Sequence, residues 1–578
     1  MVSLNLYGPD GGLAKQVLKG TLMAAGEHSI EWDGTVDGHQ LPPGDYTWSA
    51  VIHDDFVLKL RGWVGDWGGN RGVPSAATAL NDSVFLGWSL STSNAASVVA
   101  CDSNGSVRWS HHRGPISGCR ALAADAGMVY VLGGEADDAE GGSLYRLAAK
   151  DGALVPWPDG RIDLKVASLW PADGKPKPCL ADYLAVKNGR IYLSFPSDEF
   201  AAVLDAKTGA YLQTLVGAPP GAIDSVATKS DTPENPDQLV DADFVVTALK
   251  GGVIGKILLV HDPIWVVASD LTPLERNERI SALTMIGDGA KHHQHDIFVA
   301  LGFPFNQVQA RSALKTESFS YVAGQKGGRP PQGAWQADRM SVIRAVALDG
   351  EGQLWVAEGA SVPKRISVWS TDSSEGRLVR EFFAPPDSAS PVAINPSDPF
   401  LIYAGGCEWR VDATTGRAAC LGIISQEPMR AAWYIMEKDR VFLVLTPMTG
   451  AELVFERSGD GEYRPVASSA PAAAAVPPKL KLHPMPGGAW AIESSDGYVL
   501  GTVFNRAKAI VSAPLSPPSG NDWPLLSKNV GTPTLTQMPD GKVFLTAGLA
   551  RIWNLELNGI KTLRPLGAGK VTIPKRSR

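Results

Sequence analysis

The sequence predicts an all-β protein, in which a small N-terminal β-sandwich precedes a single large β-propeller of seven or eight blades. Three observations support this prediction. Short stretches of alternating apolar and polar residues recur along the chain, which is the pattern of half-buried strands. The 61 glycines and 42 prolines make the chain rich in turns. From about residue 73, a unit of two successive hairpins repeats, as it does in propeller blades.

The composition excludes several classes of protein. The chain has 578 residues, of which 44% are hydrophobic and 17 are tryptophan, so intrinsic disorder is excluded as the main state. The net charge of −7 argues against nucleic acid as the main partner. No apolar run reaches the ~18–20 residues of a membrane-spanning helix. The first residues carry no export signal, although a mature secreted chain would look the same.

Residues 1–60 are expected to form the first domain. Val2, Leu4 and Leu6 alternate with polar residues, and residues 45–51 alternate again after a Pro-Pro-Gly turn. The same stretch contains Gly26-Glu27-His28, Trp32-Asp33-Gly34, Gly38 and Leu41 to Tyr46. This pattern resembles the FlgD-type immunoglobulin-like (Ig-like) modules. The resemblance covers about a tenth of the chain and implies a β-sandwich with a packing or spacer role.

Residues 61–570 are expected to form the propeller, and residues 571–578 a basic tail. Each repeat unit reads as a four-stranded antiparallel meander with Asn-Gly or Asp-Gly turns. A tenth unit, at 241–276, is less regular than the rest. Because single propellers have typically about four to eight blades, we expect some units to share a blade. The nine regular units lie near 76–111, 120–158, 181–216, 281–323, 343–383, 391–422, 430–466, 482–512 and 533–565.

The units resemble two families of propeller. The sequences "LDAKTGAYLQTL" (204–215) and "VACDSNGSVRWS" (99–110) resemble pyrroloquinoline-quinone-type repeats, and residues 327–369 resemble NHL/SMP-30-like propellers. The vicinal cysteine pair of quinone dehydrogenases is missing, so that cofactor is not implied. Cys407 and Cys420 flank one hairpin, and they either pair in an exported protein or stay reduced and buried.

Arginines open the innermost strand of several units. Arg120, Arg344 and Arg430 each precede an alanine at that point, and Arg71 lies just before the first unit. If the units superpose, these guanidinium groups form a partial ring at one mouth of the channel, where they would bind a carboxylate or sulfate. The alternative is that each arginine forms a structural ion pair with the neighbouring blade.

Further candidate site residues are histidines and aromatic residues. His293 and His295 share one face of a strand entrance and are candidates for a general base, with Tyr321 as the acid. The alternative is a polar surface loop, and no metal site is predicted because companion ligands are missing. The cofactor stays unknown, with a structural divalent cation left open. The residues expected to bind a sugar ring, unless the tryptophans wedge between blades, are Trp67, Asn70 and Trp335.

Two functions fit these patterns. The first is a carbohydrate-active propeller that cleaves an anionic, uronate-type polysaccharide by lyase or hydrolase chemistry. The alternative is a non-catalytic propeller scaffold that binds a glycan or a protein. The lack of a ligand set disfavours a metal-dependent lactonase or oxidoreductase. We expect a secreted or periplasmic protein with a polysaccharide or oligosaccharide ligand, and the sequence leaves its oligomeric state open.

Overall fold

The computed structural model describes an all-β chain of 47 strands and one short 3-10 helix, Val166–Ser168. This confirms the predicted fold class. Among the described residues, no helix is long and apolar enough to cross a membrane. The description covers residues 2–573 except 10–12, 22, 25, 37–38, 53–55, 68–70, 91–95, 112–114, 135–141, 170–180, 182, 188, 196–199, 217–222, 227–243, 249–253, 259–263, 268–279, 286–295, 313–318, 388, 467–479, 486–488, 495–498, 504–533, 539–541, 548–550 and 558–563.

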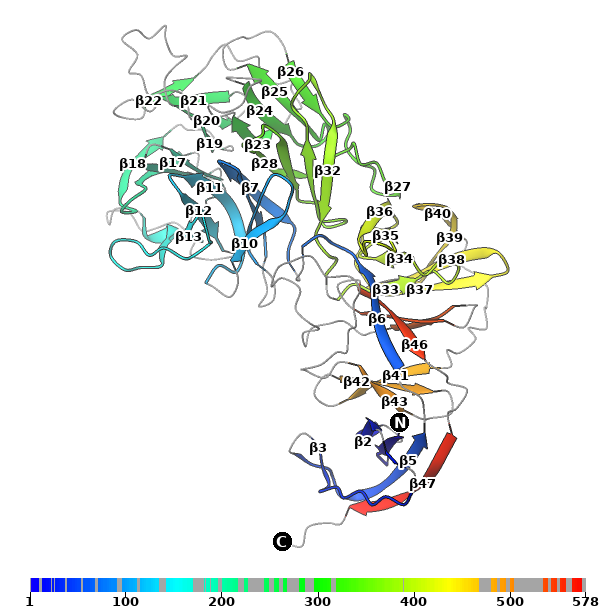
Figure 1. The fold of residues 1–578 in the computed structure, drawn as a ribbon. Helices are drawn as coiled ribbons and strands as arrows, with labels where there is room; N and C mark the ends of the chain where they lie inside the picture. Colours follow the sequence, from blue (N-terminus) through cyan, green and yellow to red (C-terminus); the bar gives the residue numbers. More distant parts are fainter. Residues whose placement is uncertain are drawn as a thin grey trace.

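The first six blades follow one another along the chain as antiparallel sheets (Figure 1). Blade 1 is β7 (Pro74–Leu80), β8 (Ser83–Trp88), β9 (Val98–Cys101) and β10 (Val107–His111). Blade 2 is β11 (Cys119–Asp125), β12 (Met128–Gly133), β13 (Ser143–Ala148) and β14 (Asp163–Lys165). Blade 3 is β15 (Tyr183–Lys187), β16 (Arg190–Phe195), β17 (Phe200–Asp205) and β18 (Tyr211–Val216). Blade 4 is β19 (Ile223–Val226), β20 (Phe244–Ala248), β21 (Ile254–Leu258) and β22 (Ile264–Val267).

Blades 5 and 6 interlock through a short strand. Blade 5 is β23 (Ile280–Met285), β24 (Asp296–Leu301), β25 (Gln307–Ser312) and β26 (Phe319–Ala323); blade 6 is β28 (Ile343–Leu348), β29 (Leu354–Glu358), β30 (Arg365–Trp369) and β32 (Leu378–Phe383). The strand β31 (Glu375–Gly376), which precedes β32, pairs in parallel with β26. The sixth blade therefore adds a fifth strand to the sheet of the fifth.

The six blades close into a ring. Each innermost strand contacts the next, in the order β7, β11, β15, β19, β23 and β28, and β28 contacts β7. Residues 74–383 therefore form one six-bladed propeller among the described strands, which we call the ring. The ends at which the six innermost strands begin define one mouth of this ring.

Four further sheets form a second blade group. The first sheet is β33 (Val392–Ile394), β34 (Leu401–Ala404), β35 (Cys407–Val411) and β36 (Ala418–Ile423) with β27 (Gly333–Ala334), and the second is β37 (Met429–Glu437), β38 (Arg440–Pro447), β39 (Leu453–Gly459) and β40 (Glu462–Pro465). The third is β41 (Leu480–Met485), β42 (Ala489–Ser494) and β43 (Val499–Val503). The fourth is β44 (Thr534–Gln537), β45 (Val543–Ala547) and β46 (Arg551–Leu557) with β6 (Phe56–Trp63). Strand β33 contacts β37 and β44, and β44 contacts β41.

The expected division of the blades was wrong. All ten repeat units form sheets, including the irregular one, which is β19–β22. They do not share one ring of seven or eight blades, because β28 returns to β7 after six blades. The remaining four sheets lie to the right of the ring and below it in Figure 1, and β6 from the N-terminal part completes the last of them.

The N-terminal module contains both ends of the described chain. Its main sheet is ordered β2 (Leu13–Thr21), β1 (Val2–Tyr7), β5 (Gly44–Ile52) and β47 (Arg564–Ile573), beside a hairpin of β3 (Thr35–Val36) and β4 (His39–Gln40). The core of the module contains Leu6, Tyr46 and Ile573. The C-terminal strand, which we expected in the propeller and its basic tail, therefore belongs to this module (Figure 1).

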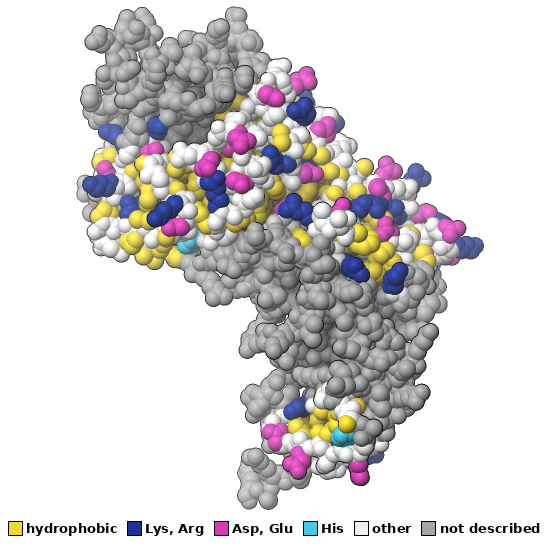
Figure 2. Space-filling view, in the orientation of Figure 1, with side chains coloured by type: hydrophobic (Ala, Val, Ile, Leu, Met, Phe, Trp, Pro, Cys, Tyr) yellow, Lys and Arg dark blue, Asp and Glu magenta, His cyan; other side chains and the backbone are white. Residues whose placement is uncertain are grey.

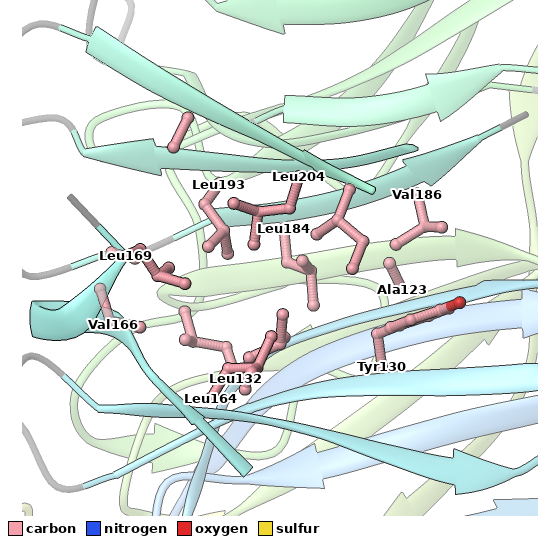
Figure 3. Close-up of a cluster of buried hydrophobic side chains, with 14 of the residues drawn as sticks. Ala123, Tyr130, Leu132, Leu164, Val166, Leu169, Leu184, Val186, Leu193 and Leu204 are labelled. Atoms are coloured by element: carbon pink, nitrogen blue, oxygen red, sulfur yellow. The ribbon is translucent and has the colours of Figure 1, made fainter. Parts of the chain in front are cut away.

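Apolar side chains fill the spaces between blades, as the alternating strand pattern requires. Figure 3 shows one such cluster, in which Leu132 and Leu164 of blade 2 face Leu184 and Leu204 of blade 3. These four side chains are buried. On the outer surface, basic and acidic side chains are interspersed over the described blades (Figure 2).

Residues 61–67, which we call the strap, cross from the second blade group to the ring. The amide of Trp63 donates to the carbonyl of Gly416 at 3.0 Å, and the amide of Asp66 donates to the carbonyl of Phe383 at 2.7 Å. Gly65 has a φ of +102°, and a Cβ atom there would lie 2.6 Å from the backbone nitrogen of Pro385. Only glycine fits this crossing without a shift of the neighbouring backbone.

Asp66 anchors the strap with a partly buried carboxylate. Its Oδ2 accepts a hydrogen bond from the amide of Phe383 at 2.9 Å. Burial raises the pKa of Asp66 to about 6, and the nearby Glu381 adds to this, whereas the Phe383 amide and Arg417 oppose it. The folded protein therefore binds this proton more tightly than the unfolded chain does.

We expect Asp66→Asn to change how stability depends on pH. A raised carboxyl pKa makes the free energy of unfolding fall as pH rises from about 4 to about 6, and stay lowered above that range. The variant should lose this slope and gain about 1–2 kcal/mol at pH 7.5 relative to the native chain. Denaturant unfolding between pH 4 and pH 8 measures the difference.

The matched control is Asp412→Asn. The amides of Thr415 and Thr414 lower the pKa of Asp412, so this variant should lose stability relative to the native chain at neutral pH and not at low pH. An Asp66→Asn profile parallel to the native one would show that Asp66 is not protonated preferentially in the folded state.

Candidate functional site

A β-bulge occurs at the same place in several innermost strands. In β11, Cys119 pairs with Gly133 and Ala121 with Leu132, so Arg120 is an extra residue. Among the described strands, β7, β23, β28 and β37 have an extra residue at the same place, and these residues are Ser75, Ser281, Arg344 and Arg430. Bulges of this kind redirect a side chain and are frequent beside functional sites. The mouth of the ring at which Ser75, Arg120, Ser281 and Arg344 lie is called the bulge rim below.

The bulge residues of the ring lie on consecutive blades. The order is Ser281 in blade 5, Arg344 in blade 6, Ser75 in blade 1 and Arg120 in blade 2, because β23, β28, β7 and β11 are successive neighbours. Ser75 Oγ donates to the carbonyl of Cys119 at 2.5 Å and so links blades 1 and 2. Two of the four predicted arginines, Arg120 and Arg344, therefore belong to one rim.

Arg344 is the more accessible of these two. It is exposed, whereas Arg120 is partly buried. Its stem lies against Gly359, where a Cβ atom would come within 2.5 Å of Arg344 Cγ. No ion pair among the described residues includes Arg344. Its guanidinium group thus presents donors to solvent, which suits a carboxylate ligand.

The other two predicted arginines do not join this rim. Arg71 is 1% exposed, and its Cζ atom lies 4.4 Å from the centroid of the Trp88 ring. Its carbonyl accepts a hydrogen bond from Lys364, whose pKa is lowered by burial. Arg430 is exposed on β37, which contacts β33 and β38, so it belongs to the second blade group. The expected ring of four arginines is therefore wrong.

The tryptophans expected to bind a sugar are packing residues. Trp67 is 3% exposed, and its ring lies 5.7 Å from that of Trp88 and 5.0 Å from that of Phe382. A ring covered in this way has no free face for a sugar. Trp335 is partly buried and packs near two guanidinium groups, with the Cζ atoms of Arg329 and Arg365 at 4.5 Å and 5.2 Å from its ring centroid. Asn70 lies outside the described residues.

Trp335 belongs to a buried polar network built around Glu358. Glu358 is fully buried, and its carboxylate binds Arg365 at 2.8 Å and Arg329 at 2.9 Å. Arg365 also binds Glu381 at 2.8 Å, and Glu381 accepts a hydrogen bond from Trp335 Nε1 at 3.2 Å. Burial raises the pKa of Glu381. The two guanidinium groups near Trp335 are thus neutralised within the protein.

Tyr321 is not placed to act as an acid on a ligand. It is 1% exposed and packs against Phe298, with ring centroids 5.3 Å apart. Its hydroxyl donates to the carbonyl of Ser370 at 2.9 Å, which joins blades 5 and 6. Burial raises the pKa of this phenol well above its usual range. Tyr321 is therefore a core residue, and the predicted catalytic role was wrong.

His293 and His295 lie outside the described residues. The strands on either side of them end and begin at Met285 and Asp296. Since Met285 pairs with Ile297 and Ile280 pairs with Leu301, these two ends lie opposite the bulge at Ser281.

The described residues contain no group of three or more His, Cys, Asp or Glu that could hold a metal ion. Cys407 and Cys420 are both buried and free, on the adjacent strands β35 and β36. Burial raises the pKa of Cys420. In this structure they are two core thiols.

Sequence reasoning missed the exposed apolar residues at the bulge rim. Phe303 is 79% exposed in the β24–β25 connection, Val342 is 44% exposed just before β28, and Leu90 is 42% exposed after β8. All three lie at the ends of strands that open onto this rim. The signal for Leu90 and Val342 was the length of the β8–β9 connection and of the segment between β26 and β28, which the hairpin pattern does not explain.

The chain resembles known proteins only distantly. No family model and no curated protein matches the chain. Solved β-propellers are similar at low identity: BamB from Moraxella catarrhalis is 10% identical with a TM-score of 0.26, over 84% of this chain and 94% of its own. The Swd1 propeller domain of Myceliophteria thermophila is 10% identical with a TM-score of 0.30, over 60% of this chain and 98% of its own. The Dos1 propeller is 11% identical with a TM-score of 0.28, over 70% of this chain and 97% of its own. At these TM-scores the similarities say nothing of function.

We expect Glu358→Gln to destabilise the protein by about 3–5 kcal/mol, because it removes the carboxylate that pairs with the buried Arg329 and leaves Arg365 with Glu381 alone. The surface variant Glu456→Gln, which removes the exposed partner of Arg440, should change stability little. Denaturant unfolding followed by tryptophan fluorescence compares the two. Equal effects of both substitutions would contradict the structural role of the Glu358 network.

Proposed function

We propose that this protein is a non-catalytic binding scaffold that holds an anionic macromolecule at the bulge rim of the six-bladed ring. The observation that carries the proposal is the accessible guanidinium group of Arg344 on a β-bulge, with Arg120 at the equivalent bulge two blades away. A concave rim with fixed cationic groups attracts carboxylates over a distance.

The burial of Tyr321 and Trp67, one predicted catalytic group and one predicted stacking group, supports binding over cleavage. A lyase needs an acid or base within reach of the bound sugar. Tyr321 is in the core, and Trp67 has no free face. What the described part of the bulge rim offers a ligand is charge and apolar surface, and these bind without reacting.

We further propose that the N-terminal module is a FlgD-type Ig-like accessory that positions the ring. The sequence pattern of residues 26–46 supports this, and so do the contacts that β1 and β2 make with β43 of the second blade group. The module would fix the second blade group at one end and leave the bulge rim free. An extracytoplasmic location belongs to the same proposal.

We expect anionic polymers to bind without being cleaved. Poly-L-glutamate and polygalacturonate are the probes, and binding is followed by calorimetry at low and at physiological salt. Arg344→Gln should weaken binding about tenfold, since a charge-assisted hydrogen bond is lost. Arg430→Gln is the matched control, because it changes an exposed arginine at the same bulge position in the second blade group.

Two results would refute this proposal. One is the release of an unsaturated uronate product, seen as rising near-ultraviolet absorbance, which would restore the lyase. The other is an equal loss of binding in Arg344→Gln and Arg430→Gln, which would place the interaction away from the bulge rim.

A further inference from the structure

The bulge rim combines cations with exposed apolar side chains on blades 5 and 6. Arg344 and Lys326 are exposed. Phe303 is 79% exposed and Val342 is 44% exposed. These four residues, Phe303, Lys326, Val342 and Arg344, are called the rim patch below. No ion pair among the described residues includes either of its cations.

The backbone holds the patch in place. The amide of Gly327 donates to the carbonyl of Phe305 at 3.0 Å, which ties the segment before blade 6 to the loop that carries Phe303. Lys326 Nζ lies 4.4 Å from the centroid of the Phe305 ring. The blade 5 loop and the segment that leads into blade 6 are thus one fixed surface.

Val342 has a backbone conformation that its side chain disfavours. Its φ is +51°, in the left-handed region that a β-branched residue rarely adopts. Its carbonyl accepts a hydrogen bond from the amide of Gly359 at 2.7 Å, and Gly359 lies against the stem of Arg344. Other left-handed residues, such as Asn81 and Lys438, sit in tight hairpin turns, whereas Val342 immediately precedes an innermost strand. Strain of this kind is typical of functional surfaces.

A charged partner or a hydrogen bond engages three carboxylates of blade 6 and the segments that flank it. Glu358 is bound by Arg365 and Arg329, and Asp387 is bound by Lys364. Asp338 accepts a hydrogen bond from Gln325. The cations of the patch are therefore available to a negatively charged partner.

We infer that the partner of the bulge rim is a protein segment that carries both acidic and apolar side chains. This inference rests on the proposed function and names its ligand class. Arginine and exposed apolar or aromatic residues on one surface are the combination found at protein–protein interfaces, and the bulge rim carries both, with Val342 and Arg344 in blade 6 and Phe303 in blade 5. A glycan would need flat rings for stacking. Of the two tryptophans expected to supply them, Trp67 is buried, and Trp335 is partly buried against an apolar cluster and two guanidinium groups. Apolar anchors such as Phe303 give a protein segment its affinity, and the cations select acidic ones.

The test uses the full chain and three probes. They are a fluorescent 12-residue peptide of alternating glutamate with phenylalanine or leucine, a peptide of equal charge with serine at the apolar positions, and polygalacturonate. Fluorescence anisotropy and calorimetry give the affinities. We expect the acidic apolar peptide to bind at least tenfold more tightly than the acidic serine peptide.

Two variants locate the interaction. Phe303→Ser should weaken the acidic apolar peptide at least fivefold and leave the serine peptide unchanged, whereas Arg344→Gln should weaken both. Leu212→Ser also replaces an exposed apolar side chain with serine, on the outer strand β18, and it should change the binding of neither peptide. Thermal unfolding confirms that each variant is folded.

The outcomes separate this inference from the proposed function. Equal binding of the two peptides, preference for polygalacturonate, or indifference to Phe303→Ser overturns the inference, and the scaffold survives if Arg344→Gln still weakens binding. Failure of all three probes to bind overturns the proposed function and the inference with it.

Discussion

The ring depends on the packing of aromatic side chains between its sixth and first blades. Blades 1 and 6 each consist of their own described strands, so no shared sheet joins the two ends of the ring. Side chains must close it instead. Trp67 packs on Trp88 and Phe382, and Phe382 stacks on Trp355 at 5.7 Å with an interplanar angle of 10°. Because interiors tolerate few voids, this seam fixes where the sixth blade meets the first, and hence the spacing of the bulge rim.

A second constraint joins the ring to the second blade group. Val64 and Phe383 share one apolar cluster with Ile402 and Ile552, which come from two sheets of that group. The Glu358 network lies beside it, and the amide of Trp335 donates to the carbonyl of Leu421 at 2.7 Å. Buried charges of this kind are costly unless each is paired, and so they favour one arrangement of the two units.

The local fold was predictable from the sequence, and its closure was not. Alternation marks each strand and turn residues mark each hairpin, so the ten sheets and the bulge arginines Arg120 and Arg344 could be located. Ring size is decided by contacts between β28 and β7, which are far apart in the chain and leave no periodic trace. The same holds for Trp67 and Arg71: both look like rim residues in sequence, and Phe382 and Lys364, from distant segments, cover them.

The pairing of β47 with β5 has a consequence for biosynthesis. The ribosome makes β47 after all the blades, so one edge of β5 stays unpaired while the blades are translated. The same delay applies to β6, which waits for β46. The blades of the ring, by contrast, are assembled from neighbouring strands and can form as they emerge. The N-terminal module therefore cannot be completed before the blades that precede β47 have been translated, and one edge of its sheet stays open until then.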